Sequence, residues 1–263
     1  MDKPRWETLL EEAVNKPGSV HACYTRFHGY SVGNQMLALW ECWARGIEPG
    51  PISTYRGWQS LGRQVKAGEK AISLWMPVTV TEKDEETGED SKKTVFVFKP
   101  RWFVLGQTEG DGVVPEPPDL GDWSLERALN GNAIDRAPFN QLNGNIQGYA
   151  SGHSIAVSPL AVTPVRTGIH EAAHVLLGHT ADGVAIVDGA ELARNLEEVE
   201  AESVVLIVMD ALGLDGQEFS RGYIQSWWGL GNAIPEASAR RIFTVADRLL
   251  RSGYESAAVA KAA

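Results

Sequence analysis

The chain has little cysteine, no long apolar run and no apolar segment at its start. Cys23 and Cys42 are the only cysteines in 263 residues, too few for a disulfide framework and outside any zinc-binding spacing. No run of about eighteen apolar residues occurs, so no membrane span is expected. The first residues, Met1–Trp6, lack the apolar stretch of a secretory signal. These absences predict a cytoplasmic globular protein whose two thiols are buried or half-buried.

Positive charge is scarce in only one half of the chain. The net charge is −10, but residues 1–110 carry as many Lys and Arg as Asp and Glu, so the excess acid lies in residues 111–263. Six of the fourteen acids in residues 1–110 cluster between Thr81 and Lys92, and the rest of that half is mildly basic. The charge therefore makes residues 111–263 a poor binder of nucleic acid without excluding nucleic acid from the first half.

A stretch rich in glycine, proline and acid separates the two halves. Residues 110–121 include Pro115, Pro117 and Pro118 together with three glycines outside any periodic pattern. Such a stretch does not hold a helix or a central strand. We therefore predict an N-terminal domain over 1–110, a linker over 111–122 and a C-terminal domain over 123–263.

Apolar spacing predicts a small α+β N-terminal domain. Helical spacing indicates helices over Trp6–Val14, from Ser31 to about Gly46, and over Tyr55–Leu61. The apolar period then changes to two over Ile72–Val78 and again over Val95–Val104, which is typical of strands. The polar segment between them is expected to form a charged hairpin tip.

The C-terminal domain is expected to be mostly helical, which makes the chain an α+β protein. A short helix is expected over Asp122–Leu129 and an extended segment over Tyr149–Val157, with Gly152 as a bulge. Thr163 followed by Pro164 predicts the start of a helix that stops at Gly178. Three more helices are expected over Glu191–Leu212, after Ser220, and from Pro235 to about Arg251.

The segment His170-Glu171-Ala172-Ala173-His174 has the spacing of a zinc-peptidase motif. Two histidines four residues apart project from one face of a helix, where both rings can bind one Zn²⁺ ion. Glu171 lies beside them and is suited to accept a proton from the attacking water. The helix is otherwise apolar, and burial of two histidines and a glutamate is costly without a shared partner.

A third ligand is needed, and the residues leave it open. A third histidine in the long-spaced pattern is excluded, because Gly178 and His179 are out of register; His179 is expected to cap the helix end. The acidic run offers Glu197, Glu198, Glu200 and Glu202. Glu198 and Glu202 share a helix face, so one can bind the metal while the other hydrogen-bonds a histidine ligand. Glu200 is expected to be solvated.

Several segments resemble the ArdC-like antirestriction proteins. They are the helix start at Ser31-Val32-Gly33-Asn34, the run Thr54–Ile72 with its Thr-Tyr-x-x-Trp-x-x-x-Gly pattern, the segment Phe98–Gly110, and Glu198–Glu202. The resemblance covers roughly residues 5–250. It implies a single-stranded-DNA-binding N-terminal domain and a zincin-like metallopeptidase C-terminal domain. It also implies that Glu198 is the third ligand and that Glu202 supports a histidine ligand.

Aromatic and basic residues alternate in the first half, as in proteins that stack single-stranded bases in a basic groove. Most tryptophans of a small domain are core residues, and Trp40 and Trp58 are expected to be buried. The candidates for contact with a DNA strand are Tyr55, Arg56, Trp58, Arg63, Lys66, Lys70, Trp75 and Arg101.

The leading hypothesis is a single-stranded-DNA-binding module joined to a zinc peptidase, with a protective or antirestriction role on a mobile element. His170, His174 and Glu198 would hold Zn²⁺, although this ligand set also accepts manganese or iron. Glu171 would act as general base, and Tyr223 is a candidate to stabilise the oxyanion. One alternative is a DNA-binding protein with a non-catalytic zinc site. The other is a regulatory protease whose first domain recognises a protein partner.

Overall fold

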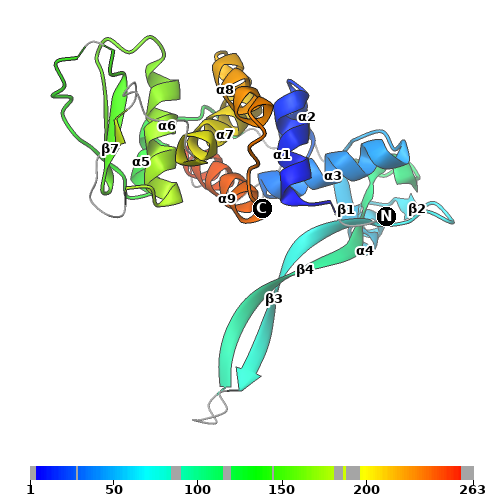
Figure 1. The fold of residues 1–263 in the computed structure, drawn as a ribbon. Helices are drawn as coiled ribbons and strands as arrows, with labels where there is room; N and C mark the ends of the chain where they lie inside the picture. The colour runs from blue at the N-terminus through cyan, green and yellow to red at the C-terminus, as the bar shows by residue number, and fades with distance from the viewer. Residues whose placement is uncertain are drawn as a thin grey trace. The chain divides into compact units, whose positions relative to one another are not determined.

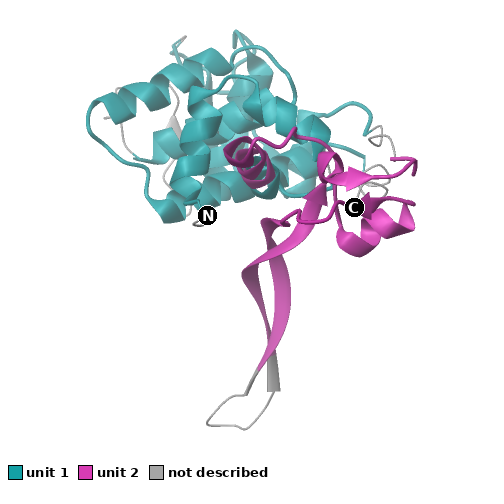
Figure 2. Cartoon of the chain, turned by 90° about the vertical axis from the view of Figure 1, so that its right-hand side faces the viewer, with its two compact units in different colours: residues 1–36, 117–263 teal, residues 37–116 magenta. Residues whose placement is uncertain are grey.

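The chain divides into two compact units in the computed structural model, which describes residues 4–27, 29–83, 90–114, 120–143, 145–180, 186–187 and 196–255. Residues 1–36 and 117–263 form the unit that we call the helical unit, and residues 37–116 form the ribbon unit (Figure 2). The sequence assigns residues 1–36 to the N-terminal domain, whereas in the structure they group with the C-terminal helices. The boundary between residues 116 and 117 falls within the expected linker. Residues 115–119 of that linker lie outside the described part.

The helical unit is built around α7 (Leu196–Ala211), which is buried along most of its length. This helix is apolar on all sides from Val204 to Met209, so neighbours can cover every face. Helices α2, α6, α8 and α9 pack against it, and α1 and α5 pack on α9 (Figure 1). The bounds are α1 Trp6–Asn15, α2 Ser19–Arg26, α5 Leu125–Gly131, α6 Pro164–Leu177, α8 Gln217–Gly229 and α9 Glu236–Ser252.

The C-terminal helices appear where the sequence predicts them, with shifted ends. The start expected for α7, at residues 191–195, lies outside the described part, and α8 begins before Ser220, at Gln217. Pro164 occupies the first turn of α6 as expected, but Thr163 makes no side-chain capping bond. No helix within the described ranges has the length and hydropathy needed to cross a membrane.

A small sheet covers one side of α6. Its strand order is β6 (Asp135–Arg136), β8 (Ser154–Val157), β7 (Gly148–Ser151) and β9 (Ile186–Val187). Strands β7 and β8 both pack against α6. The expectation of one extended segment with a bulge at Gly152 is wrong: Ser151 pairs with Ser154, so Gly152 opens a two-residue hairpin turn with φ +54°.

The ribbon unit contains the end of α3 (Val32–Arg45) and two small sheets. One sheet has the order β1 (Ile52–Thr54), β4 (Asp90–Val104) and β3 (Ile72–Lys83), and the other pairs β2 (Gln64–Val65) with β5 (Thr108–Glu109). A short 3₁₀ helix, Leu105–Gln107, joins β4 to β5. Strands β3 and β4 form a long twisted ribbon (Figure 1). Its expected charged tip includes residues 84–89, which lie outside the described part.

Helix α4 (Tyr55–Ser60) anchors the core of the ribbon unit. Thr54 caps it, because the side-chain oxygen accepts a hydrogen bond from the Gly57 backbone N–H at 3.1 Å. The Trp58 side chain is 1% exposed, and its indole N–H donates to the Phe103 carbonyl at 2.8 Å. Trp58 is therefore buried as expected, whereas Trp40 on α3 is only half-buried. Both cysteines are free and buried, which confirms the expectation for them.

Helix α2 was not foreseen, because the group that caps it is remote in sequence. The buried Asp210 carboxylate, on α7, accepts hydrogen bonds from the backbone N–H groups of Gly18 and Val20, each at 3.1 Å. A carboxylate at a helix N-terminus satisfies unpaired donors and interacts favourably with the helix dipole. The local sequence of residues 16–20 carries no such acid.

Replacing Asp210 by asparagine is expected to destabilise the helical unit by about 1–3 kcal/mol, because one of the two capped N–H groups then faces an amide donor. The free energy of unfolding from urea titration measures this loss. Asp215→Asn, at an exposed position after α7, removes the same charge and is the control. Equal stability of the two variants would contradict the capping role.

Candidate metal centre

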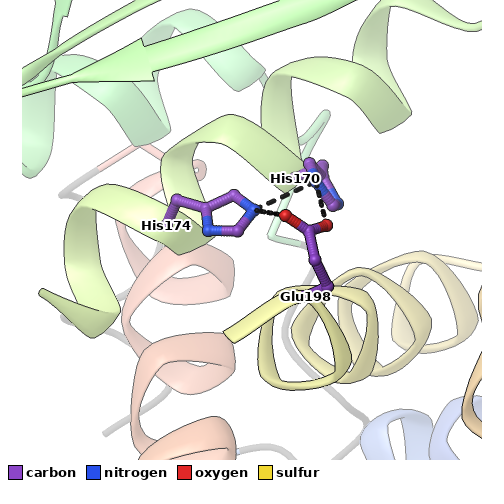
Figure 3. A group of neighbouring side chains, drawn as sticks. All are labelled: His170, His174 and Glu198. Atoms are coloured by element: carbon purple, nitrogen blue, oxygen red, sulfur yellow. Dashed lines mark hydrogen bonds and ion pairs between the residues drawn. The ribbon is translucent and has the colours of Figure 1, made fainter. Parts of the chain in front are cut away.

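Two helices bring the three expected metal ligands together. His170 and His174 project from one face of α6, and Glu198 reaches them from the first turn of α7 (Figure 3). The two Nε2 atoms are 3.1 Å apart. The Glu198 carboxylate oxygens lie 3.5 Å from His170 Nε2 and 3.6 Å from His174 Nε2.

These distances fit a shared divalent ion. Two ligand atoms that are each about 2.1 Å from an ion, at a tetrahedral angle, lie about 3.4 Å apart. The three residues each offer one ligand atom, and these three atoms lie within 4.8 Å of one another. Both histidines are buried, and Glu198 is half-buried. Two imidazoles and a carboxylate form a donor set suited to zinc, manganese or iron.

The two ligand histidines have opposite pKa shifts. Burial lowers the pKa of His170, but hydrogen bonds to Glu198 and Glu202 outweigh it and raise the pKa well above its usual value. Burial, with the neighbouring His170 and His179, lowers the pKa of His174 to about 2. Without an ion, the acids around the centre draw a proton onto one ring, which indicates a negative potential where a cation would bind.

Glu202 lies behind His170, on the side away from Glu198. One carboxylate oxygen is 3.2 Å from His170 Nδ1, and Arg166 donates to both oxygens at 2.6 Å. Burial raises the pKa of Glu202, but the hydrogen bond to His170 and the charge of Arg166 outweigh it and hold the pKa at about 2. This placement suits the supporting role that the resemblance implies for Glu202.

Sequence reasoning missed Arg166. It precedes His170 by four residues on α6, a spacing that predicts the same helix face for Arg166 and both histidines. Its guanidinium also lies 4.6 Å from the centre of the Phe219 ring on α8. Arg166 therefore neutralises Glu202 and contacts α8.

Glu171 is fully buried beneath β7. A side chain at Gly148 would place its Cβ 2.8 Å from Glu171 Oε1 and 2.7 Å from Thr167 Cγ2, closer than such atoms approach. A glycine on β7 thus leaves the space that Glu171 occupies next to His170. Tyr223 lies half-buried on α8, and its oxyanion role stays a prediction.

Two expectations about neighbouring residues are wrong. Glu200 is 1% exposed rather than solvated, and it pairs with His179 at 2.8 Å and Arg241 at 2.7 Å. The His179 ring faces this carboxylate on one side and His174 Nδ1 on the other, at 2.9 Å, instead of capping the helix end. The partners of Glu200 are remote in sequence, so the local pattern could not reveal them.

The expected DNA contacts fall into three groups. Trp58 is buried and cannot stack on a base, which makes that expectation wrong. Two basic candidates make hydrogen bonds within the ribbon unit. Arg63 donates to Thr108 Oγ1 and the Gly110 carbonyl, and Lys66 donates to the Gly106 carbonyl. The remaining candidates are at least partly exposed; they are Tyr55, Arg56, Lys70, Trp75 and Arg101.

Comparisons with known proteins agree with this architecture. Residues 6–102 match the family model for the N-terminal domain of anti-restriction factor ArdC. The crystal structure of the antirestriction ArdC protein from the R388 plasmid with bound Mn(II) is 17% identical, covers 95% of this chain and 98% of its own, and gives a TM-score of 0.52. The metal-free structure is 20% identical, covers 94% of each chain, and gives a TM-score of 0.48. No curated protein sequence matches the chain.

The family match and the fold support one reading. The chain combines a small sheet-containing N-terminal region with a mostly helical C-terminal part. Residues 6–102 match the ArdC N-terminal domain and the fold is similar to that of the R388 ArdC protein, which confirms the resemblance to ArdC-like proteins seen in the sequence.

Proposed function

We propose that the helical unit is a metal-dependent peptidase. The observation that carries this proposal is the convergence of His170, His174 and Glu198 beside the buried Glu171. Zinc is the metal that we propose. The Mn(II) in the related ArdC structure supports a divalent ion, and the ligand set accepts either metal.

Each residue has a defined task in this proposal. A divalent ion held by the three ligands supplies a Lewis acid and lowers the pKa of water towards about 7. The Glu171 carboxylate accepts a proton from the attacking water and then donates it to the nitrogen of the leaving amine. The hydroxyl of Tyr223 donates a hydrogen bond to the developing oxyanion. Glu202, held by Arg166, orients the His170 ring through Nδ1.

Metal dependence tests the peptidase proposal. The purified chain is stripped with a chelator, reloaded with zinc or manganese, and incubated with a diverse peptide library that is read by mass spectrometry. We expect cleaved peptides only after reloading. A fully loaded chain that cleaves no peptide or protein would favour the alternative of a DNA-binding protein with a non-catalytic metal site.

We also propose that the ribbon unit binds single-stranded DNA, and one surface of the ribbon favours this. On one face, Trp75 is paired with Phe98, with ring centroids 5.5 Å apart, and the neighbouring Pro77 is paired with Phe96, which is 54% exposed. Four exposed basic residues lie along β4: Lys92, Lys93, Lys99 and Arg101. Strand alternation places Lys92 on the face of the two phenylalanines and the other three on the opposite face of the ribbon. Aromatic rings beside basic side chains are the means by which proteins hold single strands without sequence preference.

Replacing Phe96 by alanine is expected to weaken binding to an oligo(dT) strand by about 1–3 kcal/mol, or roughly 5- to 150-fold, because one stacking surface is lost. Fluorescence anisotropy measures the dissociation constant. Trp43→Ala, an exposed aromatic on α3 in the same unit, is the control. Equal effects of the two changes would contradict a stacking role for the ribbon face.

The two activities together suggest protection of an incoming DNA strand on a mobile element, in the cytoplasm. The ArdC family match supports this antirestriction context. If the ribbon unit binds no single strand, then recognition of a protein substrate by that unit becomes the better account. Competition between unlabelled single strands and the cleaved protein separates these two roles.

A further inference from the structure

A line of hydrogen-bonding groups runs from His174 away from the other metal ligands. His174 Nδ1 lies 2.9 Å from Nδ1 of His179, whose Nε2 lies 2.8 Å from Glu200 Oε2. The other oxygen, Glu200 Oε1, accepts from Arg241 at 2.7 Å. The line therefore joins α6, the residue after its C-cap, α7 and α9 within the helical unit.

The Glu200 carboxylate, at the far end of this line, determines which ring nitrogens donate and which accept. Glu200 is the acceptor at this end, because one carboxylate oxygen accepts from the Arg241 guanidinium at 2.7 Å and the other faces His179 Nε2 at 2.8 Å. A carboxylate only accepts, so when the His179 ring carries one proton that proton is on Nε2, and His179 Nδ1 is an acceptor.

The same reasoning sets the tautomer of His174. Only one proton fits between two ring nitrogens 2.9 Å apart, and it belongs to His174 Nδ1 because His179 Nδ1 is an acceptor. The lone pair of His174 is then on Nε2, the atom that faces His170 and Glu198. The opposite tautomer would point an N–H at the metal position.

The backbone after α6 is shaped to hold His179 in this place. Gly178 ends the helix in the left-handed conformation, with φ +86°. The His179 N–H then bonds to the His174 carbonyl at 3.0 Å and the Gly178 N–H to the Val175 carbonyl at 3.1 Å, the pattern of a Schellman motif. This motif turns the chain back so that the His179 ring meets the ring of His174.

Helix geometry explains why Glu200 reaches His174 only through the ring of His179. Glu198, Glu200 and Glu202 follow one another at every second residue of α7, and two helical residues are turned by about 200°. Glu198 and Glu202 both face His170, so Glu200 points elsewhere on the helix. His179 spans the interval between Glu200 and His174.

We propose that His179 and Glu200 are positioning residues that fix the metal-binding tautomer of His174. The inference rests on the metal site of the proposed function. Each histidine ligand then has its own carboxylate–arginine pair: Glu202 with Arg166 acts on His170 directly, and Glu200 with Arg241 acts on His174 through His179.

Metal affinity of the full chain tests this inference. The protein is stripped of metal and titrated with Zn²⁺ against a competing chelator, and Co²⁺ absorption reports ligand geometry. Glu200→Gln keeps the shape but offers His179 a donor, so we expect 10- to 100-fold weaker zinc binding. Glu197→Gln is the matched control, since it removes the same charge from an exposed position of the same helix turn.

Two changes at His179 separate positioning from packing. His179→Gln offers an amide oxygen to His174 Nδ1, so it should restore most of the zinc affinity and the parental Co²⁺ spectrum. His179→Leu offers no acceptor and should lose 10- to 100-fold. A merely structural role would lower the stability of the metal-free fold without this difference between glutamine and leucine.

The outcomes distinguish this inference from the proposed function. Parental zinc affinity and an unchanged Co²⁺ spectrum in both Glu200→Gln and His179→Leu would overturn it. A parent chain that binds no metal would overturn the metal site and the inference together. Metal binding without hydrolysis, accompanied by the expected losses in the variants, would contradict only the peptidase proposal and would support the positioning role.

Discussion

Replacing Glu171 by glutamine is expected to lower the rate of peptide hydrolysis by about 100- to 10,000-fold, the range that a positioned general base contributes. The amide keeps the size of the side chain within the space left by Gly148, but it cannot accept a proton from water. The change leaves His170, His174 and Glu198 intact, so bound metal should stay at the parental level. The ratio kcat/KM for a peptide from the library screen measures the effect, and elemental analysis measures the metal.

Glu218→Gln is the matched control for this prediction. Glu218 is an exposed acid in the first turn of α8, and its replacement removes the same charge from the helical unit. Hydrolysis at the parental rate in Glu171→Gln would show that another group accepts the proton. A loss of metal together with activity would instead assign Glu171 a role in holding the site together.

The part of the metal centre that depends on one helix could be predicted from the sequence. His170, Glu171 and His174 lie within five residues, and helical periodicity alone places the two rings on one face. The choice among four glutamates could not be made from spacing, because it depends on how α7 crosses α6. The resemblance favoured Glu198, and the structure places that carboxylate within 3.6 Å of both rings.

The groups that support the ligands were harder to foresee. Glu200 looks like one of several acids on an exposed helix face, yet in the interior it pairs with Arg241 and hydrogen-bonds His179. These partners are 41 and 21 residues away along the chain. A buried charge is tolerated only where partners are present, so their positions decide its burial and the local pattern does not.

For the helices, too, what could be predicted depends on whether the capping group is near in sequence or remote. The start of α4 has a capping side chain next to it, Thr54, and the sequence predicts that helix. Helix α2 has its cap on α7 and was missed. Likewise, burial was expected for Trp58, whereas Phe96, which is exposed on the ribbon, was not among the expected DNA contacts.

Removing either histidine ligand is expected to abolish metal binding. His170→Ala and His174→Ala each leave only two ligands, so zinc affinity should fall by more than the 10- to 100-fold typical of an outer hydrogen-bonding partner. Binding to the folded state alone stabilises a protein by about 2.7 kcal/mol at a metal concentration of 100 times Kd. Zinc should therefore raise the unfolding temperature of the parent and leave that of both variants unchanged.

The control for this prediction is His153→Ala, which removes an exposed histidine from the turn between β7 and β8. This variant should bind zinc and gain thermal stability as the parent does. If zinc still stabilises His170→Ala and His174→Ala to the parental extent, then the ion binds elsewhere. In that case the proximity of Glu198 to the two rings reflects an ion pair with a protonated His170, the state that its raised pKa favours when no metal is bound.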